Sequence, residues 1–177
     1  MPIYDNITYN NLVRPLPEFV EWDWYDIPVV EPQKIDISQV NNGYWLVNLK
    51  NTSSKDKYAG EKIVHAFCYD DELYRFYKNP YSYLYRTSGY YAVSTLDFSM
   101  SEQMRFPQIL HAVFCNRWSG AFMQSYGRIC IPTVGWVKPD SYDICFVKYE
   151  ESFGYNGQGH QLRAFNWDEP FSNGGDN

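Results

Sequence analysis

The sequence predicts an α/β fold, with a small and mostly parallel sheet of βαβαβ type. Segments rich in β-branched and aromatic residues alternate with helix-like segments between residues 62 and 136. Five prolines interrupt residues 1–45, and five of the eleven glycines lie after residue 151. We therefore expect an irregular N-terminal arm and an irregular, Gly-rich C-terminal tail beside the sheet. Strands that alternate with helices favour parallel pairing with right-handed crossovers.

Length and composition indicate a single globular domain. The chain has 177 residues, of which 45% are hydrophobic and 20% are charged, so it can bury a sizeable core. We divide it into an arm over residues 1–45, an α/β core over residues 46–150 and a tail over residues 151–177. The arm contains many apolar and aromatic residues, which disordered segments lack, so we expect aromatic side chains to hold it across the core.

The central unit of the predicted sheet runs from residue 90 to residue 136. Residues 90–96 are β-branched and aromatic, which predicts a strand that ends at Asp97-Phe98-Ser99. Apolar residues then recur at spacings of three and four between Pro107 and Gly127. This spacing predicts a helix with one apolar stripe, closed by Gly127 in a left-handed conformation. Residues 128–134 predict the next strand.

Further elements are expected on both sides of this unit. Residues 44–49 and 62–68 predict two strands. Asp70 is placed to cap a helix over residues 72–78, and Pro80 to begin a second helix that ends at Gly89. Residues 142–149 alternate weakly between apolar and polar, which predicts one more strand.

Charge and cysteine content narrow the classes of function. The net charge is −6 and the sequence pI is about 5.0, which disfavours direct and broad contact with nucleic acid. The four cysteines have no C-x-x-C spacing and the three histidines supply no paired zinc ligands, so we expect buried free thiols, no metal and no cofactor. Neither a signal peptide nor a membrane span is predicted, and we expect a cytoplasmic protein.

Aromatic residues are the unusual part of the composition, at 19% of the chain. Tyrosine and tryptophan combine a large apolar area with a polar group, which suits half-wet surfaces and interfaces. Trp22 and Trp24 in the arm and Trp136 after the central unit are therefore candidate binding residues. A general drift of the genome towards tyrosine would explain the same composition equally well.

Polar residues follow the ends of the predicted strands, where parallel sheets bind their ligands. Asp70, Asp71, Asp97 and Ser99 lie at such ends, and Arg117 lies on the helix that follows. Asp97 could act as a general base or a magnesium ligand, but capping of a helix is the alternative role for an acidic residue here. Asp97, Ser99 and Asp143 are the candidate catalytic residues. Cys115 and His111 lie one turn apart, which is an unusual place for a nucleophile pair.

A set of short motifs occurs in a recognisable order. They are Ile27-Pro28; Val64-His65-Ala66-Phe67 before Asp70-Asp71; Asn79-Pro80; Asp97-Phe98-Ser99; Arg117-Trp118-x-Gly120-Ala121; Gln124; Gly127; Ile131-Pro132-Thr133-Val134-x-Trp136; and Ser141-Tyr142-Asp143-x-Cys145-Phe146. With this set, residues 20–147 resemble the family called domain of unknown function 4417. The resemblance implies an α/β fold and a bacterial or phage setting, but no known activity. The C-terminal part of the family pattern is missing here, and Leu96 stands where proline is common.

Two functions are compatible with these observations. The first is a non-catalytic macromolecule-binding protein of phage or mobile-element origin, such as a counter-defence inhibitor of a host immune effector. It would act in the cytoplasm of a bacterial host and bind a protein partner or a second copy of itself. The second is an α/β enzyme or nucleotide-binding domain with an acidic site around Asp97. The poor set of catalytic side chains favours the non-catalytic function over an enzyme.

Overall fold

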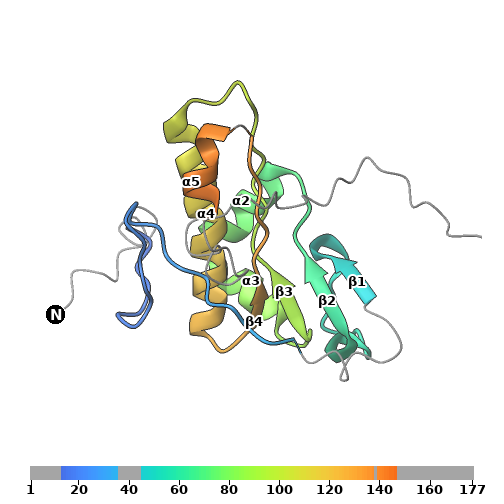
Figure 1. The fold of residues 1–177 in the computed structure, drawn as a ribbon. Coiled ribbons are helices and arrows are strands. Elements are labelled where there is room, and N and C mark those ends of the chain that lie inside the picture. The colour runs from blue at the N-terminus through green and yellow to red at the C-terminus, as the bar shows by residue number, and fades with distance from the viewer. Residues whose placement is uncertain (1–12, 36–44, 138, 147–177) are drawn as a thin grey trace, which may run out of the picture.

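The computed structural model describes residues 13–35, 45–137 and 139–146. Four short strands form one sheet in the order β1-β2-β3-β4, and every neighbouring pair is parallel. Helices connect the strands from β2 onwards, as Figure 1 shows. The strands are β1 (Trp45–Asn48), β2 (Lys62–His65), β3 (Ala92–Ser94) and β4 (Ile129–Ile131). The helices are α2 (Asp70–Lys78), α3 (Pro80–Thr87), α4 (Phe106–Ser125) and α5 (Tyr142–Cys145).

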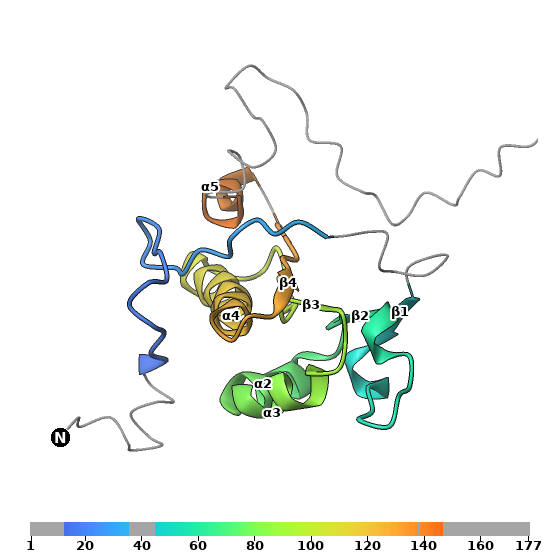
Figure 2. The ribbon, with the colours of Figure 1, turned by 90° about the horizontal axis from the view of Figure 1, so that it is seen from below.

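The parallel α/β fold is confirmed. Helices α2 and α3 connect β2 to β3, and α4 connects β3 to β4. Figure 2 shows these helices on the same face of the sheet. This arrangement follows from the strand order, because right-handed crossovers that always move in one direction place their helices on one face. Within the described residues, no helix is long and apolar enough to span a bilayer.

The strands are shorter than the residue pattern suggests. Side-chain hydroxyls replace backbone carbonyls as hydrogen-bond partners near their ends, which interrupts the regular ladder. The backbone N–H of Ala66 donates to Ser94 Oγ at 2.9 Å, and that of Thr133 donates to Thr95 Oγ1 at 2.8 Å. Residues 66–68, 95–96 and 132–134 therefore lie outside the strands.

Helix boundaries match the local signals except at α2. Asn79 caps α3 by accepting from the Ser82 backbone N–H, and Pro80 begins that helix. Gly127 closes α4 with φ +72°, as expected. The predicted capping role of Asp70 is wrong, because Tyr69 is the N-cap of α2 and Asp70 is its first residue. The Asp70 carboxylate instead accepts the backbone N–H of Ser99 at 3.0 Å.

Helix α4 does not have the single apolar stripe that its spacing suggests. Every residue from Cys115 to Met123 is buried, including the polar Asn116, Arg117 and Ser119. The sheet and helices α2 and α3 cover one side, and the arm covers another, as Figure 2 shows. The Trp118 indole N–H donates to the carbonyl of Arg14 at 2.7 Å, which fixes the arm on the helix.

The arm lies across the core, but aliphatic side chains hold it there. Ile27, Val29 and Val30 are buried, whereas Trp22 and Trp24 are exposed. The expectation that aromatic side chains hold the arm is therefore wrong for these two tryptophans, while Tyr25 is half-buried against the core. The arm also covers the outer edge of β4, where the Cys130 backbone N–H donates to Gln33 Oε1 at 2.8 Å.

The predicted strand over residues 142–149 is wrong in its described part. Residues 142–145 form helix α5, which packs Ile144 and Cys145 against Ile109, Val113 and Ile27. Residues 147–149 and the predicted tail over residues 151–177 lie outside the described residues, as do residues 1–12 and 36–44.

Candidate functional site

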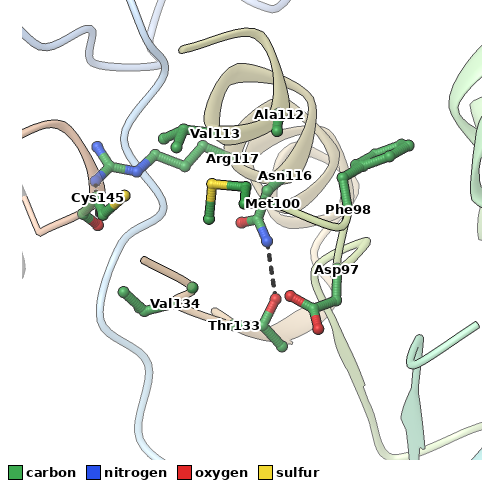
Figure 3. Close-up of a pocket in the computed structure, with 11 residues that line it drawn as sticks. Asp97, Phe98, Met100, Ala112, Val113, Asn116, Arg117, Thr133, Val134 and Cys145 are labelled. Atoms are coloured by element: carbon green, nitrogen blue, oxygen red, sulfur yellow. Dashed lines mark hydrogen bonds between the residues drawn. The ribbon is translucent and has the colours of Figure 1, made fainter. Parts of the chain in front are cut away.

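A polar network joins the carboxyl ends of β3 and β4 to helix α4. The hydroxyls of Thr95 and Thr133 lie 2.7 Å apart, and Asn116 Nδ2 donates to Thr133 Oγ1 at 2.8 Å. The Asp97 carboxylate, two residues beyond Thr95, lies beside the Thr133 hydroxyl. Figure 3 shows the Thr133 hydroxyl between the Asn116 amide and the Asp97 carboxylate.

Two hydrogen bonds of this network have a fixed direction. An amide nitrogen donates, so Thr133 Oγ1 accepts from Asn116. Thr95 Oγ1 accepts from the Thr133 backbone N–H, and one of the two threonine hydroxyls donates to the other. These bonds between protein groups tie the two strand ends to each other and to α4.

Asp97 has the electrostatics of a partly desolvated acid. Burial raises the pKa of its carboxyl, and the nearby charge of Asp70 raises it further. The neighbouring Thr133 hydroxyl lowers the pKa of this carboxyl and does not cancel these effects. Such a group can exchange a proton closer to neutrality than an exposed aspartate can.

The cavity beside Asp97 is too small for a metabolite. It offers about 20 Å³ of room for the centres of water molecules, which suffices for one ordered water. Arg117 also lines it, but Figure 3 shows the Arg117 guanidinium turned away, with Met100 between the two charged groups. The site is therefore a filled strand end and not an open pocket.

The remaining predicted site residues lie elsewhere. Ser99 and Asp71 are exposed and do not line the cavity, and neither do Asp70 and Trp136. Asp143 is exposed on α5, and the Trp136 ring contacts those of Tyr142 and Phe146. No group of three or more His, Cys, Asp or Glu side chains among the described residues is arranged to hold a metal.

The Cys115 thiol is not an activated nucleophile. Its sulfur lies 3.5 Å from His111 Nε2, as the helical spacing suggests. Burial, however, raises the pKa of the Cys115 thiol to about 11. A thiol with this pKa stays protonated at neutral pH and cannot attack a substrate.

A second feature is a loop of the arm over residues 17–28, which we call the tryptophan loop. Asp23 organises it from inside: Oδ1 accepts the backbone N–H groups of Tyr25 and Ile27 at 2.8 and 3.0 Å. Its other oxygen pairs with Arg117 Nη1 at 3.0 Å, and the two side chains are only 1% and 3% exposed. Arg117 Nη2 also donates to the carbonyls of Ile144 and Cys145.

The outer side of the tryptophan loop carries large apolar groups. Trp24 is 80% exposed and Phe19 is 74% exposed, with Trp22 half-exposed beside them. The acidic residues Glu18, Glu21 and Asp26 of the same loop are exposed as well. The loop is thus an aromatic and acidic surface on a base that is fixed by a buried ion pair.

The family model of "Domain of unknown function (DUF4417)" matches residues 21–152, which include Asp23, Asp97 and Arg117. The chain belongs to this family. Two curated phage proteins are also similar to it over 83 residues, or 47% of this chain. They are the Gene 1 proteins of Mycobacterium phage D29, at 34% identity, and of Mycobacterium phage L5, at 36%.

The family is therefore associated with phages, and its function is unknown. The matched segment covers 31% of the D29 protein and 36% of the L5 protein, so it spans about a third of each relative. No solved structure matches the chain significantly.

Part of both features could be predicted from the sequence. The predicted site residues include Asp97, Arg117, Trp22 and Trp24 but not Asp23, Asn116 or Thr133. Asn116 carries a usable signal, because an amide inside an apolar helical stretch requires a partner. No local signal connects Asp23 with Arg117, since they are 94 residues apart.

Proposed function

We propose that this protein is a non-catalytic, protein-binding member of a phage-associated family, and that the tryptophan loop is its binding surface. The observation that carries the proposal is the exposure of Trp24 and Phe19 on a loop whose base is buried and ion-paired. Large aromatic side chains exposed to water do not stabilise the fold. Such side chains are enriched among the residues that dominate binding energy at interfaces.

The internal bonds of the loop would favour tight binding. Asp23 already orders the backbone at Tyr25 and Ile27, so little conformational freedom remains to be lost when a partner binds. Trp24 contributes a rigid ring with only two rotatable side-chain bonds. A partner with an apolar recess could therefore accept Trp24 without first reorganising the loop.

Charge indicates the chemistry of that partner. The loop carries the exposed carboxylates of Glu18, Glu21 and Asp26, and the chain as a whole has a net charge of −6. Complementary potentials steer encounter and suppress wrong partners. We therefore propose a partner protein whose recess has a basic rim, rather than a second copy of this acidic chain.

A counter-defence inhibitor of a host immune effector is the finer form of this proposal. The phage relatives, the small size and the acidity support it. Its test is a plaque assay in hosts that carry different defence systems. We expect expression of the chain to restore plating against one system, and expression of Trp24→Ala to fail to do so. Equal plating with and without the chain on every defended host would contradict it.

The test of the binding surface is affinity purification from bacterial host lysate with matched variants. Trp24→Ala should lose the captured protein. Tyr85→Ala is the control, because Tyr85 is 79% exposed but lies on α3 outside the loop. The placement of the surface would be contradicted if Trp24→Ala captured the same protein as strongly as the wild type does while Tyr85→Ala captured it only weakly.

The enzyme or nucleotide-binding alternative has one observation in its favour, the raised pKa of the Asp97 carboxyl at a strand end. The water-sized cavity beside it weighs against this alternative. Saturable nucleotide binding by the wild type that disappears in a folded Asp97→Asn variant would support it.

A further inference from the structure

A larger hollow lies at the opposite end of the sheet, beside the amino ends of the strands. It offers about 300 Å³ of room, against about 20 Å³ beside Asp97. The linker between β1 and β2 supplies the lining residues of one wall, and the end of α3 with the turn before β3 supplies those of the other. This volume lies at the lower end of the range of sites for small molecules. The charged residues of its lining are Asp56, Lys57 and Arg86, and the hydroxyl groups belong to serines 53, 54 and 88 and to tyrosines 85 and 90.

Arg86 is held in place in this hollow by neutral acceptors only. Its Nε donates to Thr52 Oγ1 at 2.7 Å, and its Nη2 donates to the Lys50 carbonyl at 2.7 Å. No carboxylate of the described residues pairs with it, and its Nη1 has no hydrogen-bond partner among them. The Arg86 guanidinium is therefore held in one orientation, and no carboxylate of the described residues balances its positive charge.

The one acidic residue of the lining is already neutralised. Asp56 Oδ2 lies 2.7 Å from Lys62 Nζ, and Oδ1 accepts the backbone N–H of Tyr58. The Tyr90 hydroxyl makes a further contact with Asp56 at 3.3 Å. The two remaining charges of the lining, on Lys57 and Arg86, are both positive. This is a local excess of positive charge on a protein of net charge −6.

We propose that this hollow binds a small molecule through a phosphoryl group. Two cations and the hydroxyls of Ser53 and Ser54 can donate to an oxyanion, whereas the Ser88 hydroxyl already donates to the Tyr85 carbonyl. Arg86 contributes a planar fork that matches two phosphoryl oxygens, and Lys57 contributes a mobile point charge. A carboxylate shares part of this chemistry but has fewer acceptor positions for the same donors.

The test is an amide NMR titration of the full chain with inorganic phosphate at neutral pH and constant ionic strength, which removes general screening effects. We expect saturable shifts at Ser53, Ser54 and Gly89. Losing one charge-assisted contact should weaken binding by about tenfold in Lys57→Gln and in Arg86→Gln. Lys78→Gln should bind as the wild type does, because Lys78 is exposed but lies outside the hollow.

Two variants are needed because Arg86 also fastens the linker at Thr52. Lys57 makes no such bond, so its substitution tests the site without loosening the wall. Shifts that do not saturate, or saturable binding that survives Lys57→Gln, would overturn the proposal. Acetate is the second probe: we expect its binding to be at least about tenfold weaker, and equal binding of acetate would overturn the assignment to a phosphoryl group.

Discussion

Asp23 and Arg117 form the contact on which the tryptophan loop depends. Both side chains are buried, so their charges are well compensated only while they remain paired. Asp23 also accepts two backbone N–H groups of the loop, and Arg117 donates to two carbonyls of α5. One ion pair therefore joins the arm, α4 and α5.

Removal of one partner from this pair should be strongly destabilising. We expect Arg117→Met to lower the free energy of unfolding by about 3–5 kcal/mol, because it leaves the Asp23 carboxylate buried without its cation. Urea denaturation followed by circular dichroism measures the loss. Arg75→Met on α2 serves as an exposed control and should change little. A loss below about 1 kcal/mol for Arg117→Met would show that the pair is not the anchor.

Asp97 should give stability a particular pH dependence. Its folded-state pKa lies above the unfolded value, so the folded state binds the proton more tightly. The stability that Asp97 contributes is complete below the unfolded pKa and is lost as pH rises through the folded pKa. We therefore expect Asp97→Asn to gain stability relative to the wild type as pH rises through this window.

Urea denaturation at a series of acidic to neutral pH values tests this prediction. Glu102→Gln, a change at an exposed loop residue, is the control for removing one negative charge. The prediction fails if the difference between Asp97→Asn and wild type does not vary with pH, or varies as it does for Glu102→Gln.

At the scale of elements, the arm makes α4 a central helix. The reason it can pack so closely is Gly120, where an added Cβ would lie 2.7 Å from both a Val30 and a Thr95 methyl carbon. Val30 of the arm and Thr95, the residue after β3, thus contact the helix at Gly120 from two sides. The Gln124 side chain extends this contact, because it accepts the Glu31 backbone N–H and donates to its carbonyl.

Gly120→Ala should consequently destabilise the protein. The methyl group has no room between Val30 and Thr95, and overpacking of this kind costs about 1–3 kcal/mol. Gly60→Ala is the matched control, because nothing lies within 4 Å of its added Cβ. Thermal unfolding of the two variants would decide the matter, and equal melting temperatures would argue against close packing of the arm.

The elements from β1 to β4 could be predicted from the sequence because their signals are local, whereas helix α5 was predicted as a strand. β-Branched segments predicted the strands, Pro80 predicted the start of α3, and Gly127 predicted the end of α4. The burial of α4 on several sides could not be predicted, because it depends on the distant contacts of Arg14 and Asp23. The strand ends were placed too far along because threonine and serine hydroxyls take over backbone bonding there.

At the scale of the whole molecule, the two ends of the sheet differ. The carboxyl end, where parallel sheets hold their ligands, is filled by the Thr95, Thr133 and Asp97 network. The open hollow lies at the amino end, and the exposed aromatic surface lies on the arm. The sequence directed attention to Asp97 because strand ends are the usual place for chemistry. Exposure, which distinguishes Trp24 from a core tryptophan, depends on the fold.

Photo-crosslinking in a bacterial host tests the proposed binding surface most directly. A photoreactive phenylalanine analogue is placed at position 24 in one variant and at position 85 in another, since both side chains are largely exposed. We predict a covalent adduct with a host protein from position 24 and none from position 85. Absence of an adduct at position 24, or the same adducts from both positions, would contradict the assignment of the tryptophan loop as the binding surface.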